Sequence, residues 1–339
     1  MEKVFLAACR AEPTPHTPIW LNRQAGRYMP EYHALKGNLQ SLDFFKHPEK
    51  AAQATLDAQR ILGVDAAIMF ADLLPIMEPM GLALDYVPEV GPVFANPVRS
   101  HADVDRLVTA EAEEATPYIA DTVKNIVSGL PADIALIGFA GAPFTLASYA
   151  IEGKGSRNYT IVKKMMYEAP ATWDALMAKL VDQVTSYLQL QIASGVDAVQ
   201  LFDSWVGCLS ASDFAVYVVP HLKRLRDALA DTVPLIYFGT GNHHLLPQVA
   251  ELGFDVLAFD WRTPLGATWQ ALECPAVQGN LDPIVLCADQ PSIAAQAQRL
   301  LDEVGQRPGH IFNLGHGIIP ETPVDNVKFL VDYVHENSA

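Results

Sequence analysis

Two arginines, Arg23 and Arg27, lie four residues apart at the end of a short apolar run, Pro18–Leu21. Gly26 stands between them and leaves the backbone free to wrap closely around a ligand. Guanidinium groups bind carboxylates through two parallel hydrogen bonds, and they stay charged at every physiological pH. Two solvated surface arginines in ordinary ion pairs are the plainer interpretation of this spacing. The alternative is a binding site for a polyanion.

The charge of the whole chain limits the partners that it can have. Asp and Glu number 39 against 23 Lys and Arg, which gives a formal net charge of −16. Nucleic acid and anionic membranes both require a basic face, so neither is an expected partner. In an acidic protein, an anionic small molecule can be held only where positive charge is locally concentrated. This supports Arg23 and Arg27 as ligand-binding residues.

Length and composition indicate one compact enzyme domain. The chain has 339 residues, of which 50% are apolar and 18% are charged. This balance is typical of a folded soluble protein and not of a disordered one. The length suits one large α/β domain or two ordinary ones. Because no linker, low-complexity tract or composition shift interrupts the sequence, we expect a single domain over residues 1–339.

Cysteine usage and the N-terminal residues bear on the location of the protein. The four cysteines are scattered and form no Cys-x-x-Cys pair, which fits reduced thiols better than a disulfide framework. The apolar run within Met1–Arg10 is too short for a signal peptide, and no window approaches the length of a membrane span. We therefore expect a cytoplasmic protein with no membrane partner.

Short apolar, β-rich runs alternate with helix-like segments along the chain. The runs are Pro18–Leu21, Ala66–Phe70, Ile134–Phe139, Ala198–Phe202, Leu235–Phe238, Val256–Phe259, Ala276–Gly279 and Ile311–Leu314. Helical periodicity marks Glu49–Leu62, Glu111–Gly129, Ala171–Ser194, Ala211–Leu229, Pro291–Val304 and Pro323–His335, with a short helical stretch from His243. This alternation implies parallel strands covered on both faces. Eight units predict an α/β fold, a single (β/α)8 TIM barrel. An open doubly wound sheet is the alternative, although no G-x-G-x-x-G run follows the first strand.

In such a barrel the chemistry gathers where the strands end. Asp72 follows the second run and is flanked by leucines, so its carboxylate needs a hydrogen-bond donor or a cationic ligand. It could instead cap the next helix. Tyr149 could be a packed core aromatic, Ser204 an N-cap hydroxyl, and His316 a turn residue between two glycines. If the barrel closes, these side chains converge with the two arginines in one mouth.

A second basic segment, Glu152–Arg157, carries Lys154 and Arg157 and could help to hold anions. Its spacing does not match a phosphate-binding Walker loop, and no strand leads directly into it. A flexible, solvated loop is the simpler interpretation.

The segment Arg23-Gln-Ala-Gly-Arg-Tyr-Met-Pro-Glu-Tyr32 closely resembles the N-terminal signature of the uroporphyrinogen decarboxylase family. Further blocks resemble the same family, in order, along essentially the whole chain. They are Phe70-Ala-Asp72, Gly138–Tyr149 with Glu152-Gly153, Phe202-Asp-Ser204, Gly279–Pro283 and Asn313–Gly317. The arginine block and the block ending at Tyr149 are specific, whereas the others are weak alone and strong together.

The resemblance implies a (β/α)8 barrel, usually a homodimer, that works without a metal or an organic cofactor. It also implies conversion of the four acetate side chains of uroporphyrinogen III to methyls. That reaction releases carbon dioxide and gives coproporphyrinogen III for haem and related tetrapyrroles. Carried over by position, substrate binding falls on Arg23, Gln24, Ala25, Gly26, Arg27, Asp72, Tyr149, Ser204 and His316.

This chemistry agrees with the residue types. The substrate carries eight carboxylates, so arginine anchors are expected. A pyrrole acetate loses carbon dioxide once its ring is protonated at carbon, because the ring then accepts the electrons. A negative group near the pyrrole nitrogens would stabilise that cation, and Asp72 is the candidate. Arg23 and Arg27 are candidate catalytic residues too, as anchors, with one of them near the proton transfer.

Two other functions stay open on sequence alone. Methyltransferases that resemble this family bind zinc through a His-x-Cys pair and a distant cysteine, and the chain has no His-x-Cys. A non-catalytic tetrapyrrole-binding protein could use the same scaffold, since fold does not prove activity. Binding alone, however, does not need a carboxylate such as Asp72 facing a polyanion.

Overall fold

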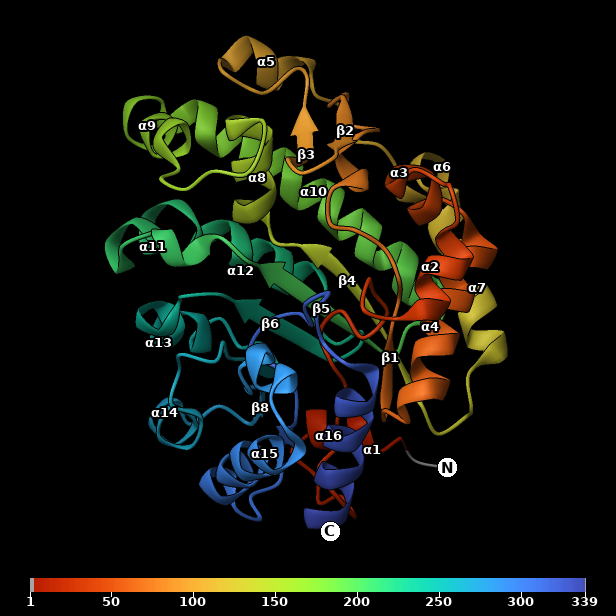
Figure 1. Cartoon of the computed structure of the whole chain (residues 1–339). Helices are drawn as coiled ribbons and strands as arrows, with labels where there is room; N and C mark the ends of the chain where they lie inside the picture. The colour runs from red at the N-terminus through yellow and green to blue at the C-terminus, as the bar shows by residue number, and fades with distance from the viewer. Residues whose placement is uncertain (1–2, 339) are drawn as a thin grey trace.

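A computed structural model describes residues 3–338, so the ends of the predicted domain, residues 1–2 and 339, lie outside the described part. The core is a curled parallel sheet in the strand order β1-β4-β5-β6-β7-β8-β9 (Figure 1). Seven of the eight predicted runs form its strands: β1 (Ala66–Ile68), β4 (Ala135–Gly141), β5 (Ala198–Asp203), β6 (Leu235–Gly239), β7 (Val256–Ala258), β8 (Ala276–Gln278) and β9 (His310–Ile311). The predicted parallel pairing is confirmed.

The eighth predicted run, Pro18–Leu21, closes the sheet into a barrel without forming a full strand. On one side it makes a single parallel bridge, Ile19 to Phe312, next to β9. On the other side the Ile19 carbonyl accepts the Asp65 N–H at the start of β1. The ladder stays short because Pro18 has no N–H and because the Leu21 N–H donates to the Gln24 side chain. The fold is the predicted (β/α)8 barrel.

The Gln24 side chain occupies the next position of the missing ladder. Its Oε1 accepts the Leu21 N–H and its Nε2 donates to the Ala66 carbonyl, both at 3.1 Å. Gln24 is fully buried, so no water could hydrogen-bond these two backbone groups in place of its side chain. One side chain therefore joins the first run to β1 across the seam of the barrel.

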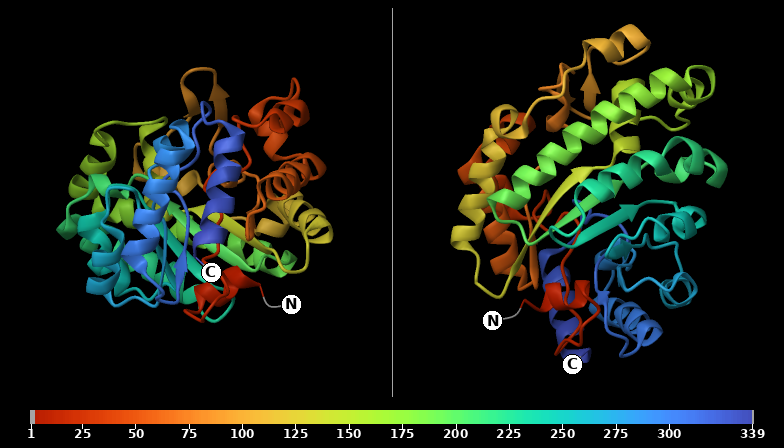
Figure 2. Two further views of the ribbon diagram at one scale, coloured as in Figure 1. Left: turned by 60° about the horizontal axis from the view of Figure 1, so that its bottom comes forward. Right: turned by 180° about the vertical axis from the view of Figure 1, so that it is seen from behind.

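Helices cover the outside of the sheet (Figures 1 and 2). The predicted helical segments correspond to α4 (Pro48–Leu62), α6 (Ala112–Ala115), α7 (Pro117–Gly129), α10 (Pro170–Ser194), α11 (Ala211–Tyr217), α12 (Val219–Ala228), α15 (Gln290–Val304) and α16 (Val324–Asn337), with η3 (His243–Leu245) and α13 (Leu246–Ala250). Two predictions were wrong in one respect, because each long helix is divided in two. The divisions fall just before Pro117 and Pro220, whose rings are compatible only with the first turn of a helix.

Several elements were not predicted. They are α1 (Val4–Cys9), α2 (Pro30–Lys36), α3 (Ser41–Phe45), α5 (His101–Arg106), α8 (Pro143–Glu152), α9 (Thr160–Glu168), α14 (Leu265–Leu272), the short helices η1 (Pro75–Met77), η2 (Val206–Cys208) and η4 (Pro283–Cys287), and an antiparallel hairpin, β2 (Leu84–Val87) with β3 (Gly91–Phe94). The hairpin lies between β1 and β4 in the chain. Most of these elements are too short to show a clear hydrophobic period.

The inside of the barrel contains a chain of polar side chains. The Trp20 indole N–H donates to Gln278, and Gln278 donates to Gln200, each at 2.9 Å. Gln200 in turn donates to Asn22 at 3.4 Å. All four residues are almost completely buried. These bonds cross the barrel from the first run to β8 and β5, so they hold its opposite walls in register.

Among the helices of residues 3–338, none combines the length and the apolarity that a membrane crossing would require.

The substitution Gln24→Ala should destabilise the protein strongly. It leaves the Leu21 N–H and the Ala66 carbonyl buried without partners, at roughly 1–3 kcal/mol each. We expect a loss of about 2–4 kcal/mol in the free energy of unfolding, measured as a shift of the urea midpoint. The matched control is Gln53→Ala, an exposed glutamine on α4, which should stay within about 0.5 kcal/mol of the wild type. Equal effects of the two variants would contradict this account of the seam.

Candidate active site

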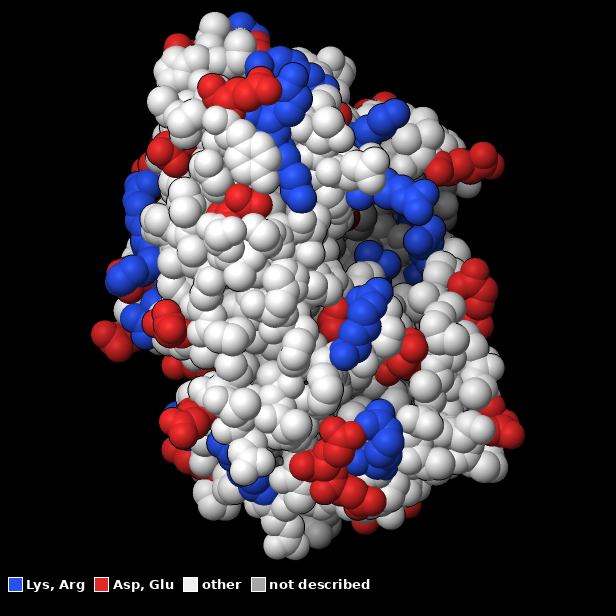
Figure 3. Space-filling view, turned by 90° about the vertical axis from the view of Figure 1, so that its left-hand side faces the viewer, with Lys and Arg blue, Asp and Glu red and all other residues white. Residues whose placement is uncertain are grey.

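The predicted site residues gather at the end of the barrel to which the strands point. In Figure 1 the arrows of β5 and β6 run toward the left-hand side of the molecule. Figure 3 shows that side in space-filling form, with Lys and Arg side chains around a hollow. Elsewhere on this face the two signs of charge are mixed. An acidic protein thus presents a locally basic opening at the carboxyl ends of its strands.

Arg23 lies at this opening in a constrained conformation. Its φ of 63° is in the left-handed region, which is uncommon for a residue with a side chain. Solvent reaches Arg23, yet burial by the surrounding protein lowers the pKa of its guanidinium, while Asp72 raises it. A Cβ atom added at Gly317 would lie 2.4 Å from Arg23 Cδ. Gly317, after the eighth predicted run, therefore leaves the space in which the Arg23 side chain lies.

Asp72 is a carboxylate held in poorly solvated surroundings. Its Oδ1 accepts the Leu74 N–H at 3.0 Å. The N-cap of η1 is Leu74 and has no side-chain cap hydrogen bond, so Asp72 does not cap this helix as the alternative from sequence held. Burial raises the pKa of Asp72, whereas the Tyr86 hydroxyl, the Leu74 N–H and the charge of Arg23 lower it. The carboxylate is thus near a cationic group and is stabilised when positive charge approaches it.

Tyr149 is positioned by contacts between α8 and the end of β5. Its ring packs on Trp205 with ring centroids 3.8 Å apart. The buried Asp203 accepts a hydrogen bond from Thr145 at 2.7 Å, and the Trp205 N–H donates to Thr145 at 3.3 Å. Thr145 thereby ties the start of α8 to the loop after β5. Burial and Asp72 raise the pKa of Tyr149 to about 12, so its hydroxyl is neutral and can donate.

His316 approaches Arg23 from the end of the eighth predicted run. Burial, Arg23 and Arg262 lower the pKa of His316 to about 4, with Asp260 acting in the opposite direction. Its ring meets Trp261 edge to face at 6.0 Å. Arg262 stacks 3.8 Å above the same Trp261 ring and pairs with the buried Asp260 at 2.9 Å. His316 is therefore a neutral imidazole at neutral pH, next to two guanidiniums.

The other predicted site residues differ in what they offer to a ligand. The Gln24 side chain is used in the seam and is fully buried, so it presents no solvent-exposed donor to a substrate. Ala25 and Gly26 are half-buried. Arg27 is exposed and close enough to influence the pKa of Arg23. Ser204 is half-buried after β5, and its carbonyl accepts the Thr240 hydroxyl.

Two residues at this end were not identified from sequence. Tyr86, on the hairpin, has a buried hydroxyl that lies close enough to Asp72 to lower the pKa of that carboxyl. Arg262 adds a third guanidinium near His316. The glycines at 81 and 91 flank the strand β2 and could have indicated the hairpin as turn residues. Nothing local distinguishes Arg262 from a surface arginine.

The basic loop Glu152–Arg157 is tied to the same hairpin. The Phe94 N–H donates to the Gly153 carbonyl at 2.7 Å, and Lys154 forms an antiparallel bridge with Val93. Lys154 and Arg157 are exposed. The loop is thus anchored through its backbone beside β3, with its cationic side chains free to meet solvent or an anion.

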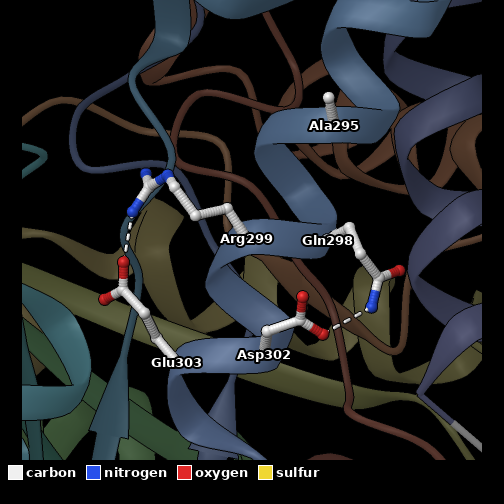
Figure 4. A pocket seen from close by; sticks show the side chains of 5 residues that line it. All are labelled: Ala295, Gln298, Arg299, Asp302 and Glu303. Atoms are coloured by element: carbon white, nitrogen blue, oxygen red, sulfur yellow. Dashed lines mark hydrogen bonds and ion pairs between the residues drawn. The ribbon is translucent and has the colours of Figure 1, made fainter.

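A hollow on the surface of α15 is not a second candidate active site. Its lining residues are Ala295, Gln298, Arg299, Asp302 and Glu303 (Figure 4). Arg299 pairs with Glu303, and Gln298 donates to Asp302 at 2.8 Å, so the polar groups satisfy one another one turn apart. The hollow brings together no residues from different elements and has the character of an ordinary solvated helix surface.

The mouth thus combines guanidiniums that can bind carboxylates with a poorly solvated carboxyl group that can stabilise a cation. Within residues 3–338, the side chains with metal-ligand spacing are His16, Asp65 and His335. These residues precede the first run or β1, or lie near the end of α16, so they are not at the mouth.

Comparisons with known proteins agree on one family. The sequence model of the family described as "Uroporphyrinogen decarboxylase (URO-D)" matches residues 2–337. A uroporphyrinogen decarboxylase of Koribacter versatilis is 48% identical over 339 residues, covering 99% of this chain and 96% of the relative. One from Chloroflexus aurantiacus is 51% identical over 343 residues, with 98% and 96% covered. One from Sorangium cellulosum is 50% identical over 337 residues, with 99% and 96% covered.

Solved structures agree on the fold. A methyltransferase from Methanosarcina mazei superimposes with a TM-score of 0.84 at 19% identity, covering 99% of each chain. A B12-independent methionine synthase from Shewanella sp. W3-18-1 gives a TM-score of 0.58 at 10% identity, covering 88% of this chain and 90% of that one. At such identities the likeness concerns the barrel and not the chemistry.

The imidazole of His316 should titrate at about pH 4, well below an ordinary histidine. The unfolded chain takes up this proton near pH 6.5, so His316 contributes a loss of stability as the pH falls from 6.5 toward 4. Removing one neighbouring charge in Arg23→Gln should raise the pKa of His316. The check is a ¹H–¹⁵N NMR titration, with the exposed Arg60→Gln as control. An unchanged pKa in Arg23→Gln would show that the two side chains do not interact.

Proposed function

The chain belongs to the uroporphyrinogen decarboxylase family, and on that premise we propose that it is a carboxy-lyase acting on uroporphyrinogen III. It converts the four acetate side chains of this tetrapyrrole to methyls, releasing four molecules of carbon dioxide. The product is coproporphyrinogen III, on the route to haem. Support comes from about 50% identity to uroporphyrinogen decarboxylases over nearly the whole chain.

The observation that carries the mechanism is the position of Asp72 next to Arg23 in a poorly solvated part of the mouth. The substrate is a polyanion, so a carboxylate at its binding site disfavours simple binding. The interaction between this carboxylate and the substrate becomes favourable when the reacting pyrrole ring carries positive charge. Asp72 is therefore suited to a cationic intermediate and not to the ground state, which is the condition for acceleration of a chemical step.

The reaction requires one proton to enter and one carbon dioxide to leave for each acetate. Protonation of a pyrrole ring carbon produces a cationic ring. The bond between the acetate methylene and its carboxylate then breaks, and its electron pair neutralises the ring. Protonation of the exocyclic methylene carbon and loss of the ring proton complete the methyl group. Asp72 would lower the energy of the cation through its negative charge near the pyrrole N–H groups.

The basic residues have a different role in this proposal. Arg23 and Arg27 bind substrate carboxylates, and Arg23 is near enough to Asp72 to place a side chain of the reacting ring beside it. Tyr149, Ser204 and His316 orient the substrate, His316 as a neutral donor or acceptor. Ala25 and Gly26 contribute through backbone close to the ligand. The Gln24 contribution is indirect, since its side chain positions the first run.

Further proposals follow from membership of this family. We propose that residues 1–339 act as a single domain, that decarboxylation needs no metal or organic cofactor, and that the enzyme is cytoplasmic.

We also propose that the protein is a homodimer. Tyr167 of α9 and Val216 of α11 are exposed apolar side chains on neighbouring helices and are candidates for its interface. Light scattering of the purified protein tests the oligomeric state.

The proposed reaction is tested by anaerobic incubation of metal-stripped protein with uroporphyrinogen III, followed by oxidation and chromatography of the porphyrins. Stepwise loss of four carboxylates, ending in coproporphyrin, is the expected result. Binding without conversion would favour a tetrapyrrole-binding protein. Conversion only after zinc is returned would contradict independence from metal.

The substitution Asp72→Asn should reduce kcat by about 10²–10³-fold with a smaller change in KM, since the carboxylate acts mainly on the cationic intermediate. In the wild type, kcat/KM should fall at acid pH as Asp72 becomes protonated, at a pH above the usual aspartate range because burial raises its pKa. This acid limb should disappear in Asp72→Asn. The control is Asp133→Asn, an exposed aspartate before β4. Near-normal turnover of Asp72→Asn would refute the stabilising role.

The substitution Gly317→Ala should weaken the reaction by moving Arg23. The new methyl would lie 2.4 Å from Arg23 Cδ, so the guanidinium must leave its position. A displacement of about 1 Å can lower a rate 10²-fold, and we expect kcat/KM to fall by about 10–100-fold, mainly through KM. The control is Gly155→Ala, where an added Cβ meets no atom within 4 Å. Unchanged kinetics in Gly317→Ala would argue against Arg23 as an anchor.

A further inference from the structure

Three ligand-type side chains meet at the end of the barrel opposite to the mouth. His16 Nε2 lies 3.1 Å from Asp65 Oδ1, and His335 Nε2 lies 2.8 Å from Asp65 Oδ2. One ligand atom from each of these residues lies within 4.8 Å of the others. The two imidazole rings are 4.6 Å apart between centroids. The decarboxylation proposed above makes no use of this cluster.

The three residues come from distant parts of the sequence. His16 lies just before the first run, Asp65 just before β1, and His335 near the end of α16. Figures 1 and 2 show α1 and α16 on the same side of the molecule. Asp65 Oδ2 also accepts the Ile19 N–H at 2.8 Å, and the Thr17 N–H donates to Ser338 at 2.9 Å. The cluster therefore lies on the seam where the barrel closes.

The ligand types and spacing suit a borderline divalent metal ion. Two imidazole nitrogens and one carboxylate oxygen favour zinc or cobalt over magnesium or calcium, which prefer oxygen ligands alone. Tetrahedral zinc with bonds of about 2.1 Å places neighbouring ligand atoms about 3.4 Å apart. His16 Nε2 lies 3.1 Å from Asp65 Oδ1, and one ligand atom from each of the three residues lies within 4.8 Å of the others, so modest side-chain movements bring the three atoms to this spacing.

The surroundings also fit a metal ion. The His16, Asp65 and His335 side chains are 25%, 14% and 29% exposed, so a water molecule can reach a fourth ligand position. Asp65 can coordinate through Oδ1 while Oδ2 keeps the Ile19 N–H, an outer hydrogen bond of the kind that orients metal-bound carboxylates. Asp332, one turn before His335 on α16, adds a second negative charge nearby.

We propose that His16, Asp65 and His335 form a divalent metal site of the zinc class at the base of the barrel. The ion links His16, two residues ahead of the first run, Asp65 before β1 and His335 of the C-terminal helix. Its role is to stabilise the seam between the first and last parts of the chain, remote from the mouth. The inference does not rest on the proposed decarboxylation, which would proceed without the ion.

The test uses Co²⁺ and Zn²⁺ as probes on the full chain after chelator treatment and desalting. Co²⁺ should bind one per chain with visible d–d absorption and without the charge-transfer band of a thiolate ligand, which separates the site from the cysteines. Zn²⁺ should displace it. At a hundredfold excess over Kd, Zn²⁺ should raise Tm by about 4 °C. The variants His16→Gln and His335→Gln should each lose at least about tenfold in affinity.

The control variant is His101→Gln, which removes a histidine near Asp105 on the short helix α5, outside the cluster. It should bind Co²⁺ as the wild type does. His16→Gln keeps the bond between His335 and Asp65, so its fold should survive, and circular dichroism checks this. Absence of 1:1 binding by the wild type would overturn the proposal. Unchanged affinity in both cluster variants would do so as well, because the metal would then be bound elsewhere.

Discussion

The closure of the barrel at its first run is the constraint on which the rest of the structure depends. Pro18–Leu21 makes one bridge to the residue after β9 and one backbone hydrogen bond to the residue before β1. Two side chains supply what the ladder lacks. Gln24 joins Leu21 to Ala66 toward the mouth, and Asp65 accepts the Ile19 N–H toward the base. Buried backbone groups must find partners, and here amide and carboxylate groups provide them.

This closure determines where the arginines that we propose as substrate anchors lie. Gln24 stands between Arg23 and Gly26, so the same turn that completes the seam directs Arg23 into the mouth at a positive φ. Gly317, from the other end of the chain, makes room for that side chain. The residue that stabilises the fold and the residues proposed to bind substrate are thus adjacent in sequence but distinct. A constrained backbone of this kind persists only where the surrounding structure enforces it.

The two ends of the barrel separate chemistry from stability. At the mouth, guanidiniums and a poorly solvated Asp72 are collected from several strand ends, which suits a polyanionic substrate that becomes cationic at one ring. At the base, Asp65 is surrounded by hydrogen-bond donors that keep it ionised and tie the chain ends together. The two aspartates on either side of β1 thus have opposite pKa shifts: the pKa of Asp72, after the strand, is raised, and that of Asp65, before it, is lowered. Burial, which raises the pKa of a carboxyl group, has the larger effect on Asp72, whereas hydrogen bonds from several donors outweigh the effect of burial on Asp65.

The alternation of apolar runs and helices, together with the arginine block, was sufficient to predict the barrel, its parallel pairing and the family. These features are local and periodic, and strand ends meet in any parallel barrel. Sequence could not show that Gln24 serves the seam, that Gln200 and Gln278 lie inside the barrel, or that Tyr86 and Arg262 approach the mouth. Each depends on a partner more than 15 residues away, or on the direction of a side chain. Composition and spacing determined which chemical groups the chain possesses. Only tertiary contacts decided which of these groups are used in hydrogen bonds and which stay available to a ligand. The reason is that burial and partners distant in sequence set the hydrogen bonding and the accessibility of each group.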